Sequence, residues 1–260
     1  MQFKVLIRGG GDLATGVAWR LYRCGMQIIV LEIPSPLVIR RKVAFASAVF
    51  EGEVEVEGVK AKLADSPQWE RDFIPVAIDP EGKYISSLHP QIIVDGIMAK
   101  RNLGTYKGMA ELVIALGPGF TAGKDVDIVI ETQRGHLLGR VIKTGSALPN
   151  TGIPCEIGGF SRERAIYSPI SGVFKTVREI GDKVSQGDLV GMVEDTEIKA
   201  KINGVIRGLI YPGSRVAKDT KIADIDPRGE SFYAFTISDK ALAIAGGVLE
   251  AILSFYKEKH

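Results

Sequence analysis

The stretch that decides the fold is VLIRGGGDLATGVAWRL, residues 5–21. Its apolar start predicts a buried strand, its glycines predict a tight turn, and the spacing of its later apolar residues predicts a helix. Gly9, Gly11 and Ala14 match the relaxed dinucleotide-binding pattern, with Gly16 just beyond. Such a turn lets the backbone approach a phosphate, and the start of the following helix attracts negative charge. The stretch therefore predicts the opening of a nucleotide-binding α/β domain.

Two acidic residues refine this prediction. Glu32 ends the next apolar run, at the distance from the glycines where an acid that binds a ribose is expected. Asp12 fits the N-cap of the helix, where its carboxylate would compete with a pyrophosphate for the same N–H groups. NAD is therefore not the default ligand, and the alternative is that the glycines serve only strand-to-helix packing. The expected ligand-binding residues of this region are Gly9, Gly10, Gly11, Asp12, Ala14, Gly16 and Glu32.

Further apolar runs predict a mostly parallel sheet. The runs at 27–33, 90–97, 111–119 and 126–132 are nearly continuous, which is typical of strands covered on both faces. Residues 53–64 alternate around Glu57-Gly58 and predict a hairpin, and residues 36–50 predict a helix. Arg40 and Arg41 are expected on the solvated face of that helix, or else near a ligand phosphate. The fold class predicted for this part is α/β, with a Rossmann-like sheet.

Two later loops are candidate sites. LGPGFTAGKDVD (116–127) is not a phosphate-binding P-loop, because Pro118 stands at a required glycine and Asp125 at the magnesium-binding hydroxyl. Gly117 and Gly119 nevertheless follow a predicted buried strand, so we expect a ligand-contacting loop. In ETQRGHLLGR (131–140), Arg134 is a candidate anion-binding residue and His136 a candidate catalytic acid or base. The alternative is an ordinary surface turn.

Composition excludes several classes of protein. Lys and Arg number 33 and Asp and Glu number 31, without a block of like charge, so we expect no nucleic-acid partner. The most apolar stretch, 241–253, is too short to span a membrane, and the first residues lack the features of a signal peptide. Cys24 and Cys155 form no disulfide framework, and no spacing predicts a metal site. We expect a reduced, cytoplasmic protein, and Cys155 to be buried and inert.

An internal repeat occupies the last hundred residues. With an offset of 32 and no gap, 168–195 aligns with 200–227, and the two halves predict one interlocked β domain. SPISGVFKTVREIGDKVSQGDLVGMVE resembles the first half of a biotinyl/lipoyl-like (barrel-sandwich) carrier domain. The resemblance implies a cofactor-bearing lysine at the hairpin tip, but Glu197 stands there. We therefore expect an inserted barrel-sandwich domain without covalent biotin or lipoate.

The predicted organisation has three parts. Residues 1–165 form the Rossmann-like domain, 166–228 the biotinyl/lipoyl-like module, and 229–260 a C-terminal helix that packs back on the first domain. Ser238 is a suitable N-cap for that helix. Gly246-Gly247 lowers its intrinsic stability, which predicts close packing against another backbone.

Four stretches in order carry a resemblance over nearly the whole chain. They are GGGDLATGVAWRLYRCG, RRKVAFASAVFEGEVEVEGV, VIALGPGFTAGKDVDIVIETQRGHLLGRVI and NTGIPCEIGG. They resemble the selenium-dependent molybdenum hydroxylase system proteins of the YqeB type. The resemblance implies an accessory protein for the maturation of a molybdenum hydroxylase, which would be its partner.

Three hypotheses about function follow. In the first, the chain is a maturation protein that binds a nucleotide-type ligand, such as the nucleotide form of molybdopterin. In the second, it is an NAD(P)-dependent oxidoreductase with His136 as the proton donor. In the third, it is a non-catalytic scaffold with a carrier-like module that lacks the modified lysine. Whether the chain is an enzyme, and whether it forms a homo-oligomer, the sequence leaves open.

Overall fold

A computed structural model describes residues 3–259. Within that range the chain forms two units. The first, here called the sheet unit, contains residues 3–36, 44–151 and 237–259, and the second, the β unit, contains residues 37–43 and 152–236.

The sheet unit is built on one nine-stranded sheet with the order β10-β9-β7-β6-β1-β2-β5-β4-β3. Its central strands pair in parallel, whereas β3 and β10 at the two edges pair antiparallel to their neighbours. A separate two-stranded sheet joins β8 to β11. The strands are β1 (Lys4–Arg8), β2 (Gln27–Glu32), β3 (Glu53–Val56), β4 (Val59–Leu63), β5 (Ile74–Ile78), β6 (Ile92–Asp95), β7 (Leu112–Leu116), β8 (Thr121–Ala122), β9 (Ile128–Ile130), β10 (Val141–Ile142) and β11 (Gly145–Ser146).

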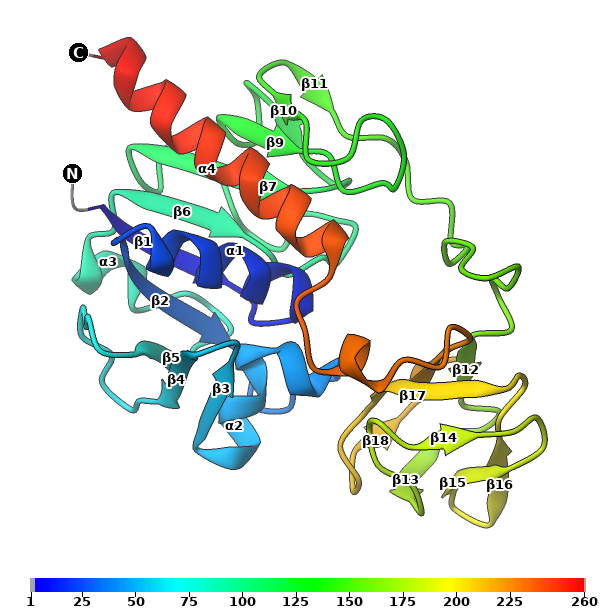
Figure 1. Ribbon diagram of the computed structural model, residues 1–260. Coiled ribbons are helices and arrows are strands. Elements are labelled where there is room, and N and C mark those ends of the chain that lie inside the picture. Colours follow the sequence, from blue (N-terminus) through cyan, green and yellow to red (C-terminus); the bar gives the residue numbers. More distant parts are fainter. Residues whose placement is uncertain (1–2, 260) are drawn as a thin grey trace. The chain divides into compact units, whose positions relative to one another are not determined.

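Burial on both faces explains the continuous apolar strands. On one face lie the helices α1 (Asp12–Arg23) and α4 (Asp239–Lys259), which pack against each other (Figure 1). On the other face, side chains of β1, β2 and β6 form a core with the one-turn helix α3 (Ile85–Leu88). The short helices η2 (Phe45–Ser47) and α2 (Ala48–Glu51) lead into β3. A strand covered in this way needs apolar residues at every position.

The Rossmann-like part of the predicted fold class is wrong. The sheet is large and mixed, and α1 is the only helix longer than one turn that joins two of its strands in the described chain. The one-turn α3 lies between β5 and β6, and a loop joins β6 to β7. In that loop the Asn102 side chain accepts hydrogen bonds from the N–H groups of Gly104 and Thr105, so local turns replace a covering helix.

Two local predictions have opposite outcomes. The hairpin at 53–64 is confirmed as β3 and β4, with Glu57 and Gly58 both at positive φ in the turn. The helix at 36–50 is wrong, because residues 37–43 belong to the β unit and only short helical turns follow. Arg40 and Arg41 are correspondingly buried, each 8% exposed, rather than on a solvated face.

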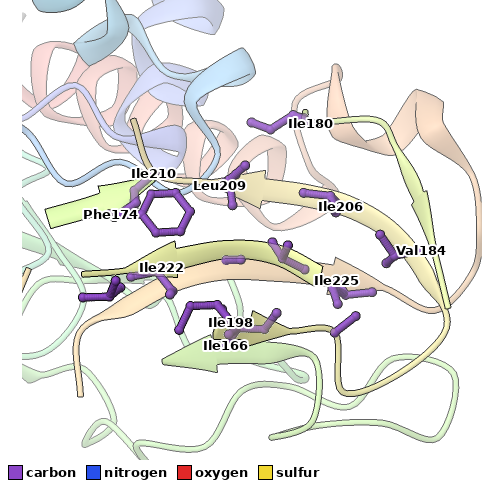
Figure 2. Close-up of a cluster of buried hydrophobic side chains, with 14 of the residues drawn as sticks. Ile166, Phe174, Ile180, Val184, Ile198, Ile206, Leu209, Ile210, Ile222 and Ile225 are labelled. Atoms are coloured by element: carbon purple, nitrogen blue, oxygen red, sulfur yellow. The ribbon is translucent and has the colours of Figure 1, made fainter. Parts of the chain in front are cut away.

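The β unit consists of two four-stranded sheets, ordered β12-β19-β17-β14 and β16-β15-β13-β18. One apolar core, with Phe174 and Leu209 fully buried, is shared by strands of both sheets (Figure 2). The strands are β12 (Ala165–Tyr167), β13 (Gly172–Thr176), β14 (Lys183–Val184), β15 (Leu189–Val193), β16 (Thr196–Lys199), β17 (Gly204–Leu209), β18 (Arg215–Val216) and β19 (Lys221–Asp226), with the turns η1 (Arg41–Val43) and η3 (Ser231–Ala234).

The sequence repeat determines how these sheets are assembled. β13, β14 and β15 of the first half recur as β17, β18 and β19 of the second. The halves exchange their short strands, since β14 pairs with β17 and β18 pairs with β13. Neither half therefore has a complete sheet of its own, and the two must fold together.

The biotinyl/lipoyl-like part of the predicted fold class is not supported. The unit is two separate four-stranded sheets, and it includes segments outside the predicted module. Residues 37–43 join it because the Leu209 N–H donates to the Ile39 carbonyl and the Arg41 guanidinium donates to the Leu209 carbonyl.

Candidate functional site

The glycine turn after β1 is held by backbone bonds at the carboxyl edge of the sheet. Gly9 has φ +88°, which favours glycine, and its N–H donates to the Leu31 carbonyl at the end of β2. A Cβ at Gly10 would lie 2.8 Å from the backbone nitrogen of Ala46. Both glycines are therefore required by the fold.

Glu32 holds this turn in place. One of its carboxylate oxygens accepts the Gly10 N–H at 2.8 Å and the other accepts the Ile33 N–H at 2.8 Å. Burial raises the pKa of this carboxyl, and the two backbone bonds lower it only in part. The structure thus gives Glu32 protein partners at both oxygens, where a ribose hydroxyl was expected.

Gly11 presents an open approach to the start of α1. It is the N-cap residue, with φ −63° and ψ 174°, and a Cβ there would meet nothing within 4 Å. Asp12, expected at the cap, is the first helical residue instead, and no side chain caps the helix. The N–H groups of Gly11, Leu13 and Ala14 have no acceptor among the described residues. Unpaired N–H groups beside an open position form a surface that favours an anion.

The other two residues of the motif serve packing. A Cβ at Gly96 would lie 2.8 Å from that of Ala14, and a Cβ at Gly16 would lie 2.7 Å from that of Ala241 in α4. Ala14 and Gly16 are both buried. These small residues let α1 approach the end of β6 on one side and α4 on the other.

A third segment, residues 96–101, packs against both the glycine turn and the loop after β7. A Cβ at Gly9 would lie 3.0 Å from the Ile97 backbone, and one at Gly119 would lie 2.7 Å from the Arg101 nitrogen. Residues 9–12, 96–101 and 117–119 therefore pack side by side, and we call them the carboxyl-edge loops. In open α/β sheets, this edge is where ligands bind.

The middle loop combines backbone strain with positive charge. Met98 and Lys100 both have φ +61°, a conformation uncommon for residues other than glycine. Strain of this kind concentrates at functional sites. Lys100 and Arg101 are exposed, and neither side chain has a hydrogen bond or ion pair to another described residue. Lys100 and Arg101 were not predicted as site residues, because no sequence motif spans this loop.

A buried polar chain supports the loops from below. The Arg8 guanidinium donates to the Thr105 hydroxyl at 2.6 Å, which donates to Asp95 at 2.5 Å. All three side chains are buried, at 5%, 0% and 2% exposure. The pKa of Asp95 is raised, because burial outweighs three opposing effects. These are the hydrogen bonds from Thr105 and from the Ile97 N–H, and the charge of Arg8. In the sequence, the only indication of this cluster is that the apolar runs of β1 and β6 end in the charged residues Arg8 and Asp95.

The loop after β7 is fixed by the segment after β9. A Cβ at Gly117 would lie 2.4 Å from the Thr132 hydroxyl oxygen, so this site admits only glycine. Glu131, 2% exposed, accepts the N–H groups of Thr132 and Gln133 at one oxygen and that of Leu148 at the other. Glu131 thus orders the segment on which Gly117 rests.

Arg134 and His136 lie on the segment after β9, which β7 and β6 separate from β1. The Arg134 guanidinium binds both oxygens of Asp239, at 2.6 Å each. His136 is exposed and has no hydrogen bond to another described residue. The structure therefore brings the glycine turn, Glu32 and Gly119 together, whereas Arg134 pairs with Asp239 and His136 is exposed.

Other features that could form a site lie outside the carboxyl-edge loops. A surface cavity of about 620 Å³ lies beside α3, away from the glycine turn, and His89, Tyr106 and Met109 line it. Across residues 3–259, no group of three or more His, Cys, Asp or Glu side chains could hold a metal ion. Cys155, expected to be buried, is exposed, as is Cys24. No helix in this range is long and apolar enough to cross a membrane.

Comparison by sequence finds a homologue of unknown activity. The chain is 51% identical over 254 residues to the uncharacterized protein YqeB of Escherichia coli strain K12. The match covers 96% of this chain and 47% of that protein, so the chain spans about half the length of its relative. No protein-family model matches the chain.

Comparison by structure finds distant similarities. The apo ectoine utilization protein EutE (DoeB) of Ruegeria pomeroyi matches at 12% identity and a TM-score of 0.26, with 86% of each chain covered. A succinylglutamate desuccinylase from Silicibacter matches at 13% identity and a TM-score of 0.27, again with 86% of each chain covered. At TM-scores of 0.26 and 0.27, these similarities carry no conclusion about the fold of this chain. They assign no activity to this chain.

Proposed function

We propose that this homologue of YqeB binds a phosphate-bearing, nucleotide-type ligand at the carboxyl-edge loops. The observation that carries the proposal is the open N-cap at Gly11, beside N–H groups of Gly11, Leu13 and Ala14 that have no acceptor within residues 3–259. A phosphate oxygen at this position would accept those N–H groups and gain from the helix dipole. Lys100 and Arg101, on the neighbouring loop, add positive charge for the remaining phosphate oxygens.

The ligand class follows from what the loops offer. Backbone N–H groups and two flexible cations recognise phosphates without a requirement for one particular base. Glu32 is already occupied by backbone donors, so we assign it to positioning the Gly10 turn. The loops therefore lack the free acid with which a dinucleotide-binding site holds the ribose of NAD, and the preference for a molybdopterin nucleotide rests on the sequence resemblance.

The biological role proposed here is maturation of a selenium-dependent molybdenum hydroxylase in the cytoplasm. Its support is the resemblance of the four sequence stretches to that accessory system. In this role the carboxyl-edge loops hold the nucleotide form of the cofactor, or its precursor, and the hydroxylase is the partner that receives it.

The substitution Gly11→Asp tests the binding site. Aspartate is a preferred N-cap residue and the backbone of Gly11 is extended, so the variant should fold at least as stably as the wild type. Its carboxylate would occupy the anion position and repel a phosphate. We expect a molybdopterin nucleotide at 100 times its dissociation constant to stabilise the wild type by about 2.7 kcal/mol and the variant by much less.

Thermal unfolding with molybdopterin nucleotide, CTP, pyrophosphate, NADH and NADPH provides the measurement. The matched control is Arg71→Ala, which removes an exposed arginine from the loop before β5, at the opposite edge of the sheet. Equal stabilisation of Gly11→Asp and the wild type by every nucleotide would refute the site. Selective stabilisation by NADH or NADPH together with turnover would favour an oxidoreductase instead.

Hydroxylase activity in cells that lack this protein tests the maturation role. Expression of the wild type or Arg71→Ala should restore the activity, whereas Gly11→Asp should not. Full restoration by Gly11→Asp would separate the maturation role from ligand binding and support a scaffold.

A further inference from the structure

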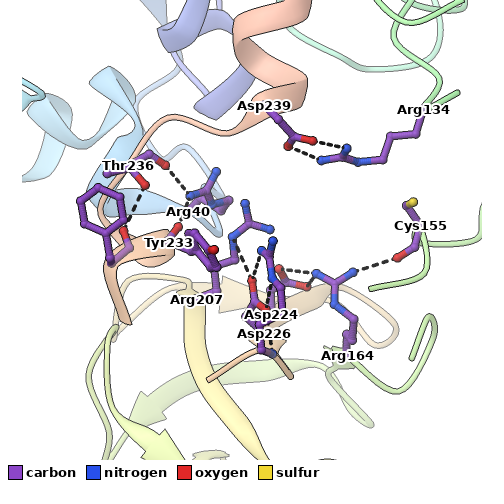
Figure 3. Close-up of polar contacts among 12 residues, drawn as sticks. Arg40, Arg134, Cys155, Arg164, Arg207, Asp224, Asp226, Tyr233, Thr236 and Asp239 are labelled. Atoms are coloured by element: carbon purple, nitrogen blue, oxygen red, sulfur yellow. Dashed lines mark hydrogen bonds and ion pairs between the residues drawn. The ribbon is translucent and has the colours of Figure 1, made fainter. Parts of the chain in front are cut away.

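The β unit contains a buried group of cationic side chains that the proposed function does not use. The group surrounds two buried aspartates, Asp224 and Asp226, on β19 (Figure 3). Among the described residues, the side chains that act on these two carboxylates or on Arg207 through charge are Arg40, Arg164, Lys221 and Arg228. With Arg207 included, five cations therefore lie around these two aspartates.

Both aspartates are already engaged by other partners. Asp224 accepts from the Arg164 guanidinium at 3.3 Å and from Lys221 at 3.1 Å. Asp226 accepts two bonds from the Arg228 guanidinium, at 2.9 and 2.6 Å. Such a bidentate pair uses both oxygens of the carboxylate. Both aspartates therefore already accept hydrogen bonds from cations other than Arg207.

Arg207 is the cation that these contacts leave without a hydrogen bond. It is 8% exposed, and its buried Nε has no hydrogen-bond acceptor among the described residues. Its Nε lies 3.7 Å from an Asp226 oxygen, which is an ion pair but too long for a hydrogen bond. An arginine buried in this state costs free energy that the fold recovers only if another acceptor is supplied.

The local backbone directs Arg207 into this position. Residue 207 lies at a bulge in β17, where the pairing with β19 shifts between Ile206 and Gly208. Bulges re-aim a side chain relative to a regular strand and are frequent at functional sites. Burial and the charges of Arg40 and Arg228 lower the pKa of Arg207 to about 10, and the charges of Asp224 and Asp226 offset this only in part.

We propose that the β unit binds a phosphate group, free or carried by a larger molecule, at the guanidinium of Arg207. A tetrahedral oxyanion offers several acceptors to the planar fork of an arginine, and it would balance the excess of positive charge. The group reaches solvent at Arg228, whose side chain is 41% exposed, so a small anion has access. The proposal concerns the β unit alone and does not depend on ligand binding at the carboxyl-edge loops.

Phosphate binding to the wild type and to Arg207→Met is the test. Calorimetric titration with inorganic phosphate is compared with sodium chloride at equal ionic strength, and sulfate, acetate and CTP are further titrants. We expect phosphate to bind the wild type, and Arg207→Met to bind it about 30-fold more weakly or worse. Arg215→Met, which removes an exposed arginine on β18, should bind as the wild type does.

Stability without phosphate gives a second, independent readout. Because methionine removes an uncompensated buried charge, Arg207→Met should unfold at the same or a higher temperature than the wild type in phosphate-free buffer. Added phosphate should raise the unfolding temperature of the wild type and not that of the variant. If Arg207→Met does not fold, Arg207→Lys, which keeps the charge but loses the fork, should fold and bind phosphate more weakly than the wild type.

Three results would overturn the proposal. They are binding of phosphate no stronger than that of chloride, unchanged binding by both Arg207 variants, and preference for acetate over phosphate. Gly11→Asp should leave inorganic phosphate binding in the β unit intact, which distinguishes this site from the carboxyl-edge loops. Loss of CTP binding in Arg207→Met would indicate that the phosphate is carried by a nucleotide.

Discussion

At the scale of single residues, the site depends on which polar groups the fold has already used. Glu32 resembles a ribose-binding acid in the sequence, yet its two oxygens accept backbone N–H groups of Gly10 and Ile33. Arg207 shows the reverse, because this residue belongs to no motif and its buried Nε has no hydrogen-bond acceptor among the described residues. Hydrogen-bond satisfaction therefore separates structural residues from candidate ligand-binding residues here.

The buried carboxyl of Glu32 predicts a pH dependence of stability. Its pKa is raised above its usual value of 4.5 by burial, so the folded state binds the proton more tightly than the unfolded state. The contribution of Glu32 to stability is then complete below pH 4.5 and is lost as pH rises through the folded-state pKa. We expect the wild type to gain stability relative to Glu32→Gln as the pH is lowered from 7 towards 4.5.

Urea denaturation of both proteins at several pH values measures this difference. The glutamine can accept at only one position, so at pH 7 we also expect it to weaken the turn by about 1 kcal/mol. A stability difference that does not change with pH would contradict the raised pKa.

At the scale of elements, the helix α4 closely approaches the segment between β9 and β10 because the facing residues are glycines. A Cβ at Gly247 of α4 would lie 2.1 Å from the Gly139 carbonyl oxygen, whereas one at Gly246 would have only the end of Arg20 nearby, at 3.7 Å. The close packing predicted for the Gly246-Gly247 pair therefore rests on Gly247. Gly246 keeps the low helix propensity of glycine without a packing reason.

Alanine at these adjacent positions should have opposite effects on stability. Gly246→Ala should stabilise α4 by up to about 1 kcal/mol, because alanine favours the helix more than glycine does. Gly247→Ala should destabilise the protein by about 1–3 kcal/mol, because its methyl group would overlap a backbone carbonyl. Thermal or urea unfolding of the two variants measures this contrast, and equal effects of the same sign would refute it.

At the scale of the whole molecule, neither of the two units is continuous in the sequence. Residues 37–43 are separated from the rest of the β unit by more than a hundred residues, yet Ile39 packs against its core and pairs with Leu209. The stability of the β unit therefore depends on a segment, residues 37–43, that lies far from the rest of the unit in the sequence.

The substitution Ile39→Ala should weaken the β unit and not the sheet unit. Ile39 is partly buried, so the expected loss is about 1–2 kcal/mol, less than for a fully buried isoleucine. Hydrogen exchange should accelerate in residues 152–236 and remain unchanged in β1, β2 and β6, which have their own core. Acceleration spread evenly over both units would contradict the assignment of this segment.

Several local elements could be predicted from the sequence, although the helix predicted at 36–50 could not be confirmed. Continuous apolar runs identified β2, β6, β7 and β9, the Glu57-Gly58 turn identified the hairpin, and the repeat identified the paired halves of the β unit. Each of these depends on neighbouring residues or on a fixed spacing, which a single chain displays directly. The glycine turn was identified for the same reason.

The assembly of these elements, and the residues that form the sites, could not be predicted from the sequence. The mixed sheet, the loops in place of covering helices and the burial of Arg40 depend on contacts between distant segments. The carboxyl-edge loops and the Arg207 group likewise gather residues with no common motif. Charge balance and hydrogen-bond satisfaction are sums over spatial neighbours, so spacing along the chain does not reveal them.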